Sequence, residues 1–149
     1  MLLLDCSLTT CAFLAARICC CSNKSAIDAC AKCQGTTQQQ TDALKIAFAI
    51  LKAIQAEPDM QPNHVTFATL LKATGALLPG GEERNKIAQA VFAKAQQAGM
   101  VDYYTLANLR KSVEVHVLQS LLKDMQDSQG SIDYKKIPQL WCKNVSLKQ

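Results

Sequence analysis

The 149-residue sequence has few aromatic residues. They make up 5% of the chain, whereas alanine is plentiful, so a β-sandwich is disfavoured and closely packed helices of small residues are expected. Charged residues make up 19% and hydrophobic residues 49%, which is ordinary for a folded protein and argues against a disordered chain. We therefore predict an all-α protein of about one domain.

Motifs of catalysis are lacking as well. The sequence has no phosphate-binding loop, dinucleotide fingerprint, metalloprotease motif or paired-carboxylate site. Its only histidines, His64 and His116, have no recognisable nucleophile or aspartate partner in the sequence. We predict a binding protein, not an enzyme, with no cofactor.

A strong positive charge is also missing. The net charge is +4 and the isoelectric point is near 8.6, below the value above 9 that is typical of dedicated nucleic-acid domains. Lysines and arginines are spread along the chain, and their one close grouping lies in the tail, at Lys135, Lys136, Lys143 and Lys148. The charge permits a polyanionic partner without identifying one.

The eight cysteines do not form a distributed framework. All but Cys142 crowd into residues 6–33, and neighbouring cysteines cannot join distant elements, so reduced thiols in an intracellular compartment are expected. Cys30 and Cys33 have the spacing of a metal or redox pair. A zinc site would need two more ligands from residues 19–21, so we interpret these thiols as packing groups and predict no metal.

Residues 1–22 form an apolar, cysteine-rich segment whose only charges are Asp5 and Arg17. No lysine or arginine precedes Leu8, so the positive start of a signal peptide is missing, and no organelle transit peptide is recognisable. A membrane span would bury both charges, at a cost of about 3 kcal/mol each. We interpret this segment as a diverged or truncated helix of a preceding repeat and predict no membrane partner.

The middle of the chain contains an internal sequence repeat with an offset of 36 residues. In this alignment Val65, Phe67, Thr69 and Leu70 are matched by Val101, Tyr103, Thr105 and Leu106. A third, diverged copy lies upstream at a spacing of 44 residues, because residues 35–40 are expected to lengthen a turn. A repeat of this length is typical of a solenoid of stacked helix pairs.

Caps and breakers predict where the helices begin and end. We expect helices over 24–34 and 42–56, a helix capped by Asn63 that runs to about residue 74, and a helix over 82–98; Thr41 is a further candidate cap. Residues 75–81 are expected to form a turn. Phe48 and Phe92 are predicted to be buried core residues of successive second helices.

The boundary after residue 102 stays open. Apolar periodicity continues from 102 to 125 without glycine or proline, so one long helix is allowed, whereas the repeat requires a break near residues 112–115. Residues 23–129 are predicted to hold the repeats. Residues 130–149, with the only tryptophan, Trp141, are predicted to form a capping tail, and a free basic tail is the alternative.

Two stretches resemble the first helix of the pentatricopeptide repeat, a unit of about 35 residues with paired helices. Residues 60–71 read Met-Gln-Pro-Asn-His-Val-Thr-Phe-Ala-Thr-Leu-Leu, and residues 26–33 read Ala-Ile-Asp-Ala-Cys-Ala-Lys-Cys. The likeness covers about residues 23–125 as about three diverged repeats of a short or fragmentary protein. It implies a short right-handed α-solenoid of antiparallel helix pairs. The Trp and Leu-Gly-x-x-Tyr signature of tetratricopeptide arrays is absent.

The resemblance implies a monomer that binds single-stranded RNA in mitochondrial or chloroplast RNA metabolism, where two or three side chains of each repeat read one base. The positions carried over as RNA-binding are Lys24, Asn63, Val65, Val101 and Tyr104. Two further positions of that pattern are occupied by Ala68 and Gly99, which have no hydrogen-bonding side chain, so the middle unit is not expected to discriminate bases. The alternative is a helical scaffold whose groove takes a protein partner without RNA.

Overall fold

The computed structural model describes residues 20–145, with side chains from residue 24 onward; residues 1–19, which hold most of the apolar N-terminal segment, and residues 146–149 lie outside the described residues. Within the described part the chain is helical, without a named β-strand, so the all-α prediction is confirmed. The elements are α2 (Cys20–Ala31), α3 (Thr37–Ala56), α4 (His64–Leu77), α5 (Glu82–Ala98), α6 (Tyr103–Ser112), α7 (Val115–Leu121), the 3-10 helices η1 (Lys123–Met125) and η2 (Tyr134–Lys136), and α8 (Gln139–Cys142).

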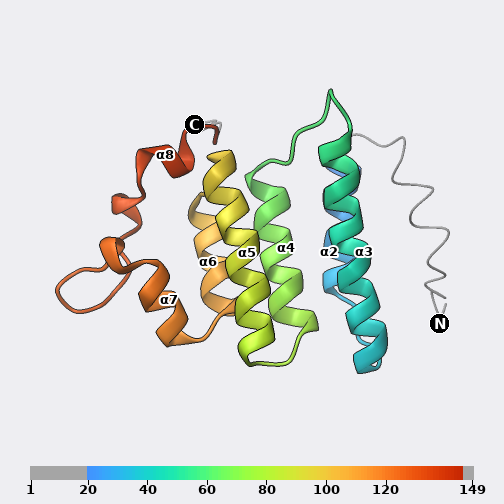
Figure 1. Ribbon diagram of the computed structural model, residues 1–149, viewed down its shortest axis with the longest axis horizontal. Helices are drawn as coiled ribbons and strands as arrows, with labels where there is room; N and C mark the ends of the chain where they lie inside the picture. The colour runs from blue at the N-terminus through green and yellow to red at the C-terminus, as the bar shows by residue number, and fades with distance from the viewer. Residues whose placement is uncertain (1–19, 146–149) are drawn as a thin grey trace.

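The long helices form two layers. Helix α4 is central, because it packs on α2 and α6 in its own layer and on α3 and α5 in the other. Helices α2 and α6 lie behind α3 and α5 in the view of Figure 1, and successive helices run in opposite directions. Every long helix therefore shares a core with at least two neighbours.

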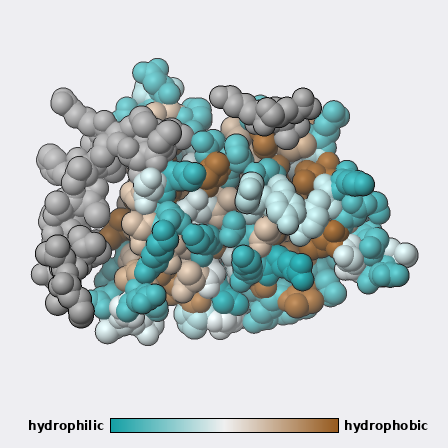
Figure 2. Space-filling model, turned by 180° about the vertical axis from the view of Figure 1, so that it is seen from behind, coloured by the Kyte–Doolittle hydropathy of each residue, from teal (hydrophilic) through white to brown (hydrophobic). Residues whose placement is uncertain are grey.

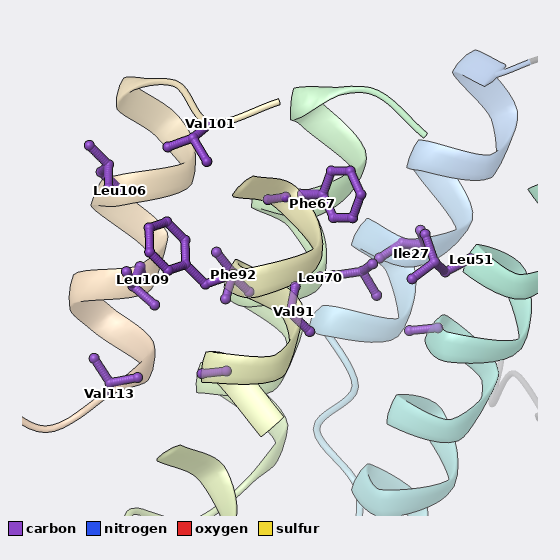
Figure 3. Close-up of a cluster of buried hydrophobic side chains, with 14 of the residues drawn as sticks. Ile27, Leu51, Phe67, Leu70, Val91, Phe92, Val101, Leu106, Leu109 and Val113 are labelled. Carbon is purple, nitrogen blue, oxygen red and sulfur yellow. The ribbon is translucent and has the colours of Figure 1, made fainter. Parts of the chain in front are cut away.

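The core runs without interruption between the layers. Phe67 and Leu70 of α4 lie at its centre, with Phe92 of α5 on one side and Ile27 of α2 on the other (Figure 3). All four side chains are fully buried. The same cluster includes Leu51, Ile54, Leu71, Ala88, Val91, Val101, Leu106, Leu109, Leu122 and Met125.

Helices α4 and α6 approach each other closely at Gly75. A Cβ atom at this position would lie 2.9 Å from Ser112 Oγ and 3.2 Å from Ser112 Cα. The Ser112 hydroxyl, 2.6 Å from the carbonyl oxygen of Leu71, donates a buried hydrogen bond between the two helices. Gly75 thus lies inside α4, which continues to Leu77, and the predicted turn over 75–81 is wrong for residues 75–77.

The bounds of two other helices, α2 and α3, differ from those predicted. Helix α3 begins at Thr37 because Thr36 forms a capping box with Gln39, so Thr41 is not its cap and residues 35–40 do not simply lengthen a turn. Helix α2 spans Cys20–Ala31, so it begins before residue 24 and ends before residue 34.

The helix is interrupted between α6 and α7, which is the alternative that the repeat required. Helix α6 ends at Ser112 and α7 begins at Val115. The buried side chain of Asn85, on α5, accepts a hydrogen bond from the Glu114 N–H at 3.1 Å. This bond satisfies a backbone donor that the interrupted helix would otherwise leave unpaired.

The N-caps set the register of the first layer at 39 residues, not 36. Asn63 Oδ1 accepts hydrogen bonds from the Thr66 N–H and hydroxyl, and Asp102 Oδ1 accepts the same two from Thr105. In this register Leu70 corresponds to Leu109, and both are buried. The predicted offset is wrong by three residues, close to one helical turn of 3.6 residues, and such a shift preserves the apolar pattern.

The second layer has its own register of 41 residues. The buried positions Leu44, Ala47, Ile50, Leu51 and Ile54 of α3 coincide with Asn85, Ala88, Val91, Phe92 and Ala95 of α5. Phe92 therefore corresponds to Leu51 and not to Phe48. Phe92 is fully buried as predicted, whereas Phe48 is half-buried, so the prediction of a core role was wrong for Phe48.

The C-terminal tail is docked up to residue 145. The ring of Trp141 meets that of Phe92 edge to face, with centroids 5.7 Å apart. The Trp141 carbonyl accepts a 2.8 Å hydrogen bond from the Val101 N–H, and the Asn144 side chain donates to the Ala98 carbonyl at 2.7 Å. The tail thus fixes the link between α5 and α6.

The close approach at Gly75 yields a stability prediction. We expect Gly75→Leu to lower the free energy of unfolding by about 1–3 kcal/mol, because the new side chain would force α4 and α6 apart. Gly80→Leu is the matched control, since a Cβ atom at this position would meet only the far end of the Arg84 side chain, at 3.4 Å. Urea unfolding followed by circular dichroism measures both. Equal midpoints for the two variants would contradict the close packing of the two helices.

A second prediction separates the two phenylalanines. We expect Phe92→Ala to cost about 3–5 kcal/mol of stability, the usual range for a buried phenylalanine, and Phe48→Ala to cost less than about half of that. Phe92→Ala should also move native Trp141 emission to longer wavelength, because the indole would no longer pack on the Phe92 ring. Chemical denaturation and fluorescence spectra measure these effects, and equal destabilisation by both variants would show that the second-layer register is wrong.

Candidate nucleic-acid interface

The outer side of α6 carries a stripe of four residues spaced by three or four positions, Tyr104, Ala107, Asn108 and Lys111. The 39-residue register places Val65, Ala68, Thr69 and Lys72 at the same positions of α4. Tyr104 is 68% exposed, and Lys72 and Lys111 are exposed as well. Each stripe therefore begins with an apolar or aromatic side chain and ends with a lysine.

An ion-pair cluster joins α2 to α4 on the same side. Asp28 Oδ1 lies 2.6 Å from Lys72 Nζ, and Asp28 Oδ2 lies 2.7 Å from Lys32 Nζ. We call the surface that carries these residues and the two stripes the α2–α4–α6 face. Figure 2 shows the side opposite to that of Figure 1, on which hydrophilic side chains cross the molecule and hydrophobic residues appear between them.

Asp28 is the acidic group at the centre of this cluster. Hydrogen bonds from Lys32 and then from Lys72 lower the pKa of its carboxyl below the usual value, against the smaller opposing effect of burial. A lowered pKa in the folded state adds stability above the ordinary carboxyl range, and this contribution is lost as the pH falls through the lowered pKa. At neutral pH the charged Asp28 offsets part of the positive charge of the two lysines.

The predicted site residues are only partly brought together. Lys24 is exposed on α2, Val65 is half-buried in its stripe, and Tyr104 is exposed. The Asn63 side chain serves as the N-cap of α4. Val101 is fully buried beside Trp141, so it cannot contact a ligand in this structure, and its assignment to a base-flanking position is corrected.

The register also changes which residues are equivalent. In the 39-residue register Tyr104 corresponds to Val65, and Ala107 corresponds to Ala68. The 36-residue alignment had instead paired Tyr104 with Ala68. The polar groups in the stripes bond to their own helices: Thr69 Oγ1 donates to the Val65 carbonyl at 2.7 Å, and Asn108 Nδ2 donates to the Tyr104 carbonyl at 2.9 Å. The Thr69 hydroxyl donor and one N–H of the Asn108 amide are thus already engaged.

Several residues of this surface were missed by sequence reasoning. Tyr103 is 57% exposed, and its ring contacts those of Tyr104 and Tyr134, with centroids 5.9 and 4.9 Å apart. The seven-residue spacing from Tyr104 to Lys111 was a readable signal of a shared helix face. Tyr134 had no such signal, because its contact with Tyr103 forms only when the tail docks.

A hollow lies on the opposite layer, along α3 and α5. It has a volume of about 440 Å³, and Leu44, Phe48, Leu78 and Ile87 form its apolar part. Lys45, Lys52 and Glu83 stand at its edge. This hollow explains why Phe48 is half-buried.

The described residues hold no group of three His, Cys, Asp or Glu side chains placed to bind a metal ion. Every helix in the described part of the chain is too short or too polar to reach across a lipid bilayer. Comparison of the chain with models of protein families, with curated proteins and with solved structures finds no match. The functional argument therefore rests on the residues and their geometry.

Proposed function

We propose that this chain is a short pentatricopeptide-like module, a segment of right-handed α-solenoid, that binds single-stranded RNA on the α2–α4–α6 face. The resemblance of residues 60–71 to the repeat's first helix supports this proposal, as does the identical capping arrangement at Asn63 and Asp102. A role in organellar RNA metabolism follows from the family resemblance.

The observation that carries the proposal is the repeated stripe on α4 and α6. Lys72 and Lys111 occupy equivalent positions one repeat apart, where ammonium groups can contact successive phosphates of a strand. Tyr104 lies two turns away on the same helix face, where its exposed ring can stack on a base. Positive charge combined with an exposed aromatic ring is the chemistry by which proteins hold single strands without reading their sequence.

Low sequence selectivity is part of the proposal. Ala68 and Ala107 have no group that could bond to a base edge, and Ala68 and Thr69 are buried. The Thr69 hydroxyl and one N–H of the Asn108 amide are engaged with backbone carbonyls. Binding on this face would therefore come from phosphate contacts and stacking. Such binding weakens steeply as salt is added.

A protein-binding scaffold is the second candidate, and the hollow beside Phe48 favours it. Its half-buried aromatic ring and apolar lining on α3 and α5 could take a side chain from a partner. Affinity capture from lysate, with and without nuclease, distinguishes the two functions. Partners that remain after nuclease treatment and no longer bind Phe48→Ala would support the scaffold.

The RNA proposal predicts a difference between the two layers. We expect Lys72→Gln combined with Lys111→Gln to weaken binding of a mixed single-stranded RNA and to reduce the salt slope by about 0.7 for each phosphate no longer neutralised. Lys52→Gln with Lys94→Gln removes the same charge from exposed sites on α3 and α5 and should have little effect. Fluorescence anisotropy at several salt concentrations measures both. Failure of the wild-type chain to bind at high micromolar concentration would refute the proposal.

The ion-pair cluster predicts a gain of affinity. Asp28→Asn removes the carboxylate that holds Lys32 and Lys72, so we expect tighter RNA binding at neutral pH. Asp42→Asn is the control, because Asp42 is also paired with a lysine but lies on α3 in the other layer. The same anisotropy titration applies, and an unchanged or weaker affinity in Asp28→Asn would place the strand elsewhere.

A further inference from the structure

The C-terminal tail closes a hollow beside α6 that the repeat pattern does not explain. Its volume is about 260 Å³, and its walls come from α6, α7, η2 and the loop between η1 and η2. Val115, Leu118 and Ile132 supply the apolar part. Polar and aromatic groups come from Arg110, Gln119, Gln126, Ser131 and Tyr134.

The loop that forms one wall is held by its own hydrogen bonds. The Asp127 carboxylate accepts from the Gln129 and Ser131 N–H groups at 2.8 and 2.9 Å. Gln126 and Ile132 form an antiparallel bridge, and Lys136 Nζ donates to the Gln126 carbonyl at 3.3 Å. The hollow is therefore formed before any ligand arrives, which lowers the ordering cost of binding.

One residue that lines the hollow, Arg110, is charged where the equivalent residue of α4 is apolar. Arg110 corresponds to Leu71, which is fully buried in the core shared with α6. On α6 the same position is an exposed arginine that faces the hollow, and no ion pair involves it within the described residues. An uncommitted guanidinium at the mouth of a hollow is suited to a phosphate group.

We propose that this hollow binds one unstacked nucleotide of the RNA strand, an inference that rests on the proposed function. Tyr134 would stack on the base, and Arg110 would contact its phosphate. The side chains of Gln119 and Ser131 would bond to the polar edge of the base, together with the carbonyl oxygen of the Gln126 side chain, whose N–H donates to the Gln119 backbone carbonyl at 2.9 Å. The volume is below the roughly 300–1,000 Å³ of pockets for drug-sized ligands, so it suits a single base.

The aromatic residues connect this hollow to the α2–α4–α6 face. The rings of Tyr104, Tyr103 and Tyr134 follow one another at centroid distances of 5.9 and 4.9 Å. A strand that stacks on Tyr104 could therefore continue past Tyr103 and place its next base against Tyr134. Because amides and a hydroxyl surround the hollow, it is the place where this protein would select a base.

The test uses the full chain and ten-nucleotide single-stranded RNAs that each lack the base at one successive position. With wild-type protein we expect one position at which removal of the base weakens binding about tenfold, the size of one stacking contact. Ser131→Tyr, which fills the hollow, should abolish this position dependence. Ser128→Tyr is the control, because Ser128 is exposed in the same loop and does not line the hollow.

A second measurement separates this inference from the function on which it rests. Each of the four nucleoside 5′-monophosphates is titrated at millimolar concentration while the amide signals of the protein are followed by nuclear magnetic resonance. Shifts at Gln119 and Gln126 that vanish in Ser131→Tyr support the hollow even if longer RNA does not bind. RNA binding without position dependence, or with the same dependence in Ser131→Tyr, overturns the inference and leaves the proposed function standing. Absence of both RNA binding and amide shifts overturns both.

Discussion

The contact between α4 and α6 at Gly75 and Ser112 determines the geometry of the α2–α4–α6 face, which we propose to bind RNA. It combines a position without a side chain, a small hydroxyl side chain and a buried hydrogen bond to the Leu71 carbonyl. Lys72 directly follows Leu71, and Lys111 directly precedes Ser112. The bond from the Ser112 side chain to the α4 backbone thus also fixes the spacing of the two lysine positions that we propose for phosphate contact.

Asn85 has a comparable role in the second layer. The equivalent residue of α3 is Leu44, a core residue. The same helix position is therefore apolar in α3 and carries a hydrogen-bond acceptor in α5. The acceptor is used by the Glu114 N–H, where the chain leaves α6 and turns into α7. Without that turn α6 could continue, and the tail could not fold back to place Tyr134 beside Tyr103 or Trp141 against Phe92.

Local signals in the sequence predicted the helices better than their relation to one another. Asn63 and Gly99 began or ended helices as expected, and the capping box at Thr36 and Gln39 was equally readable from its spacing. The repeat offset was wrong because a shift of three residues keeps apolar positions on the same side of a helix. The hydrogen bond of Ser112 joins residues 41 positions apart, and that of Asn85 joins residues 29 positions apart. No local sequence pattern predicts contacts between such distant segments.

The same limit applies to the candidate site. Tyr104 and Lys24 are exposed, as their places in the family resemblance require, and their role in binding stays a prediction. Val101 is buried beside the tail, which is a tertiary property that the local sequence does not show. The two stripes end in lysines, whereas Ala68 is buried and Ala107 has no hydrogen-bonding side chain, so the face that we propose to bind RNA has few groups that could distinguish bases. Selectivity requires side-chain amides or hydroxyls held in fixed positions around a base. In this chain those groups gather around the hollow that the tail forms, so the segment outside the repeats is the part that could make recognition specific.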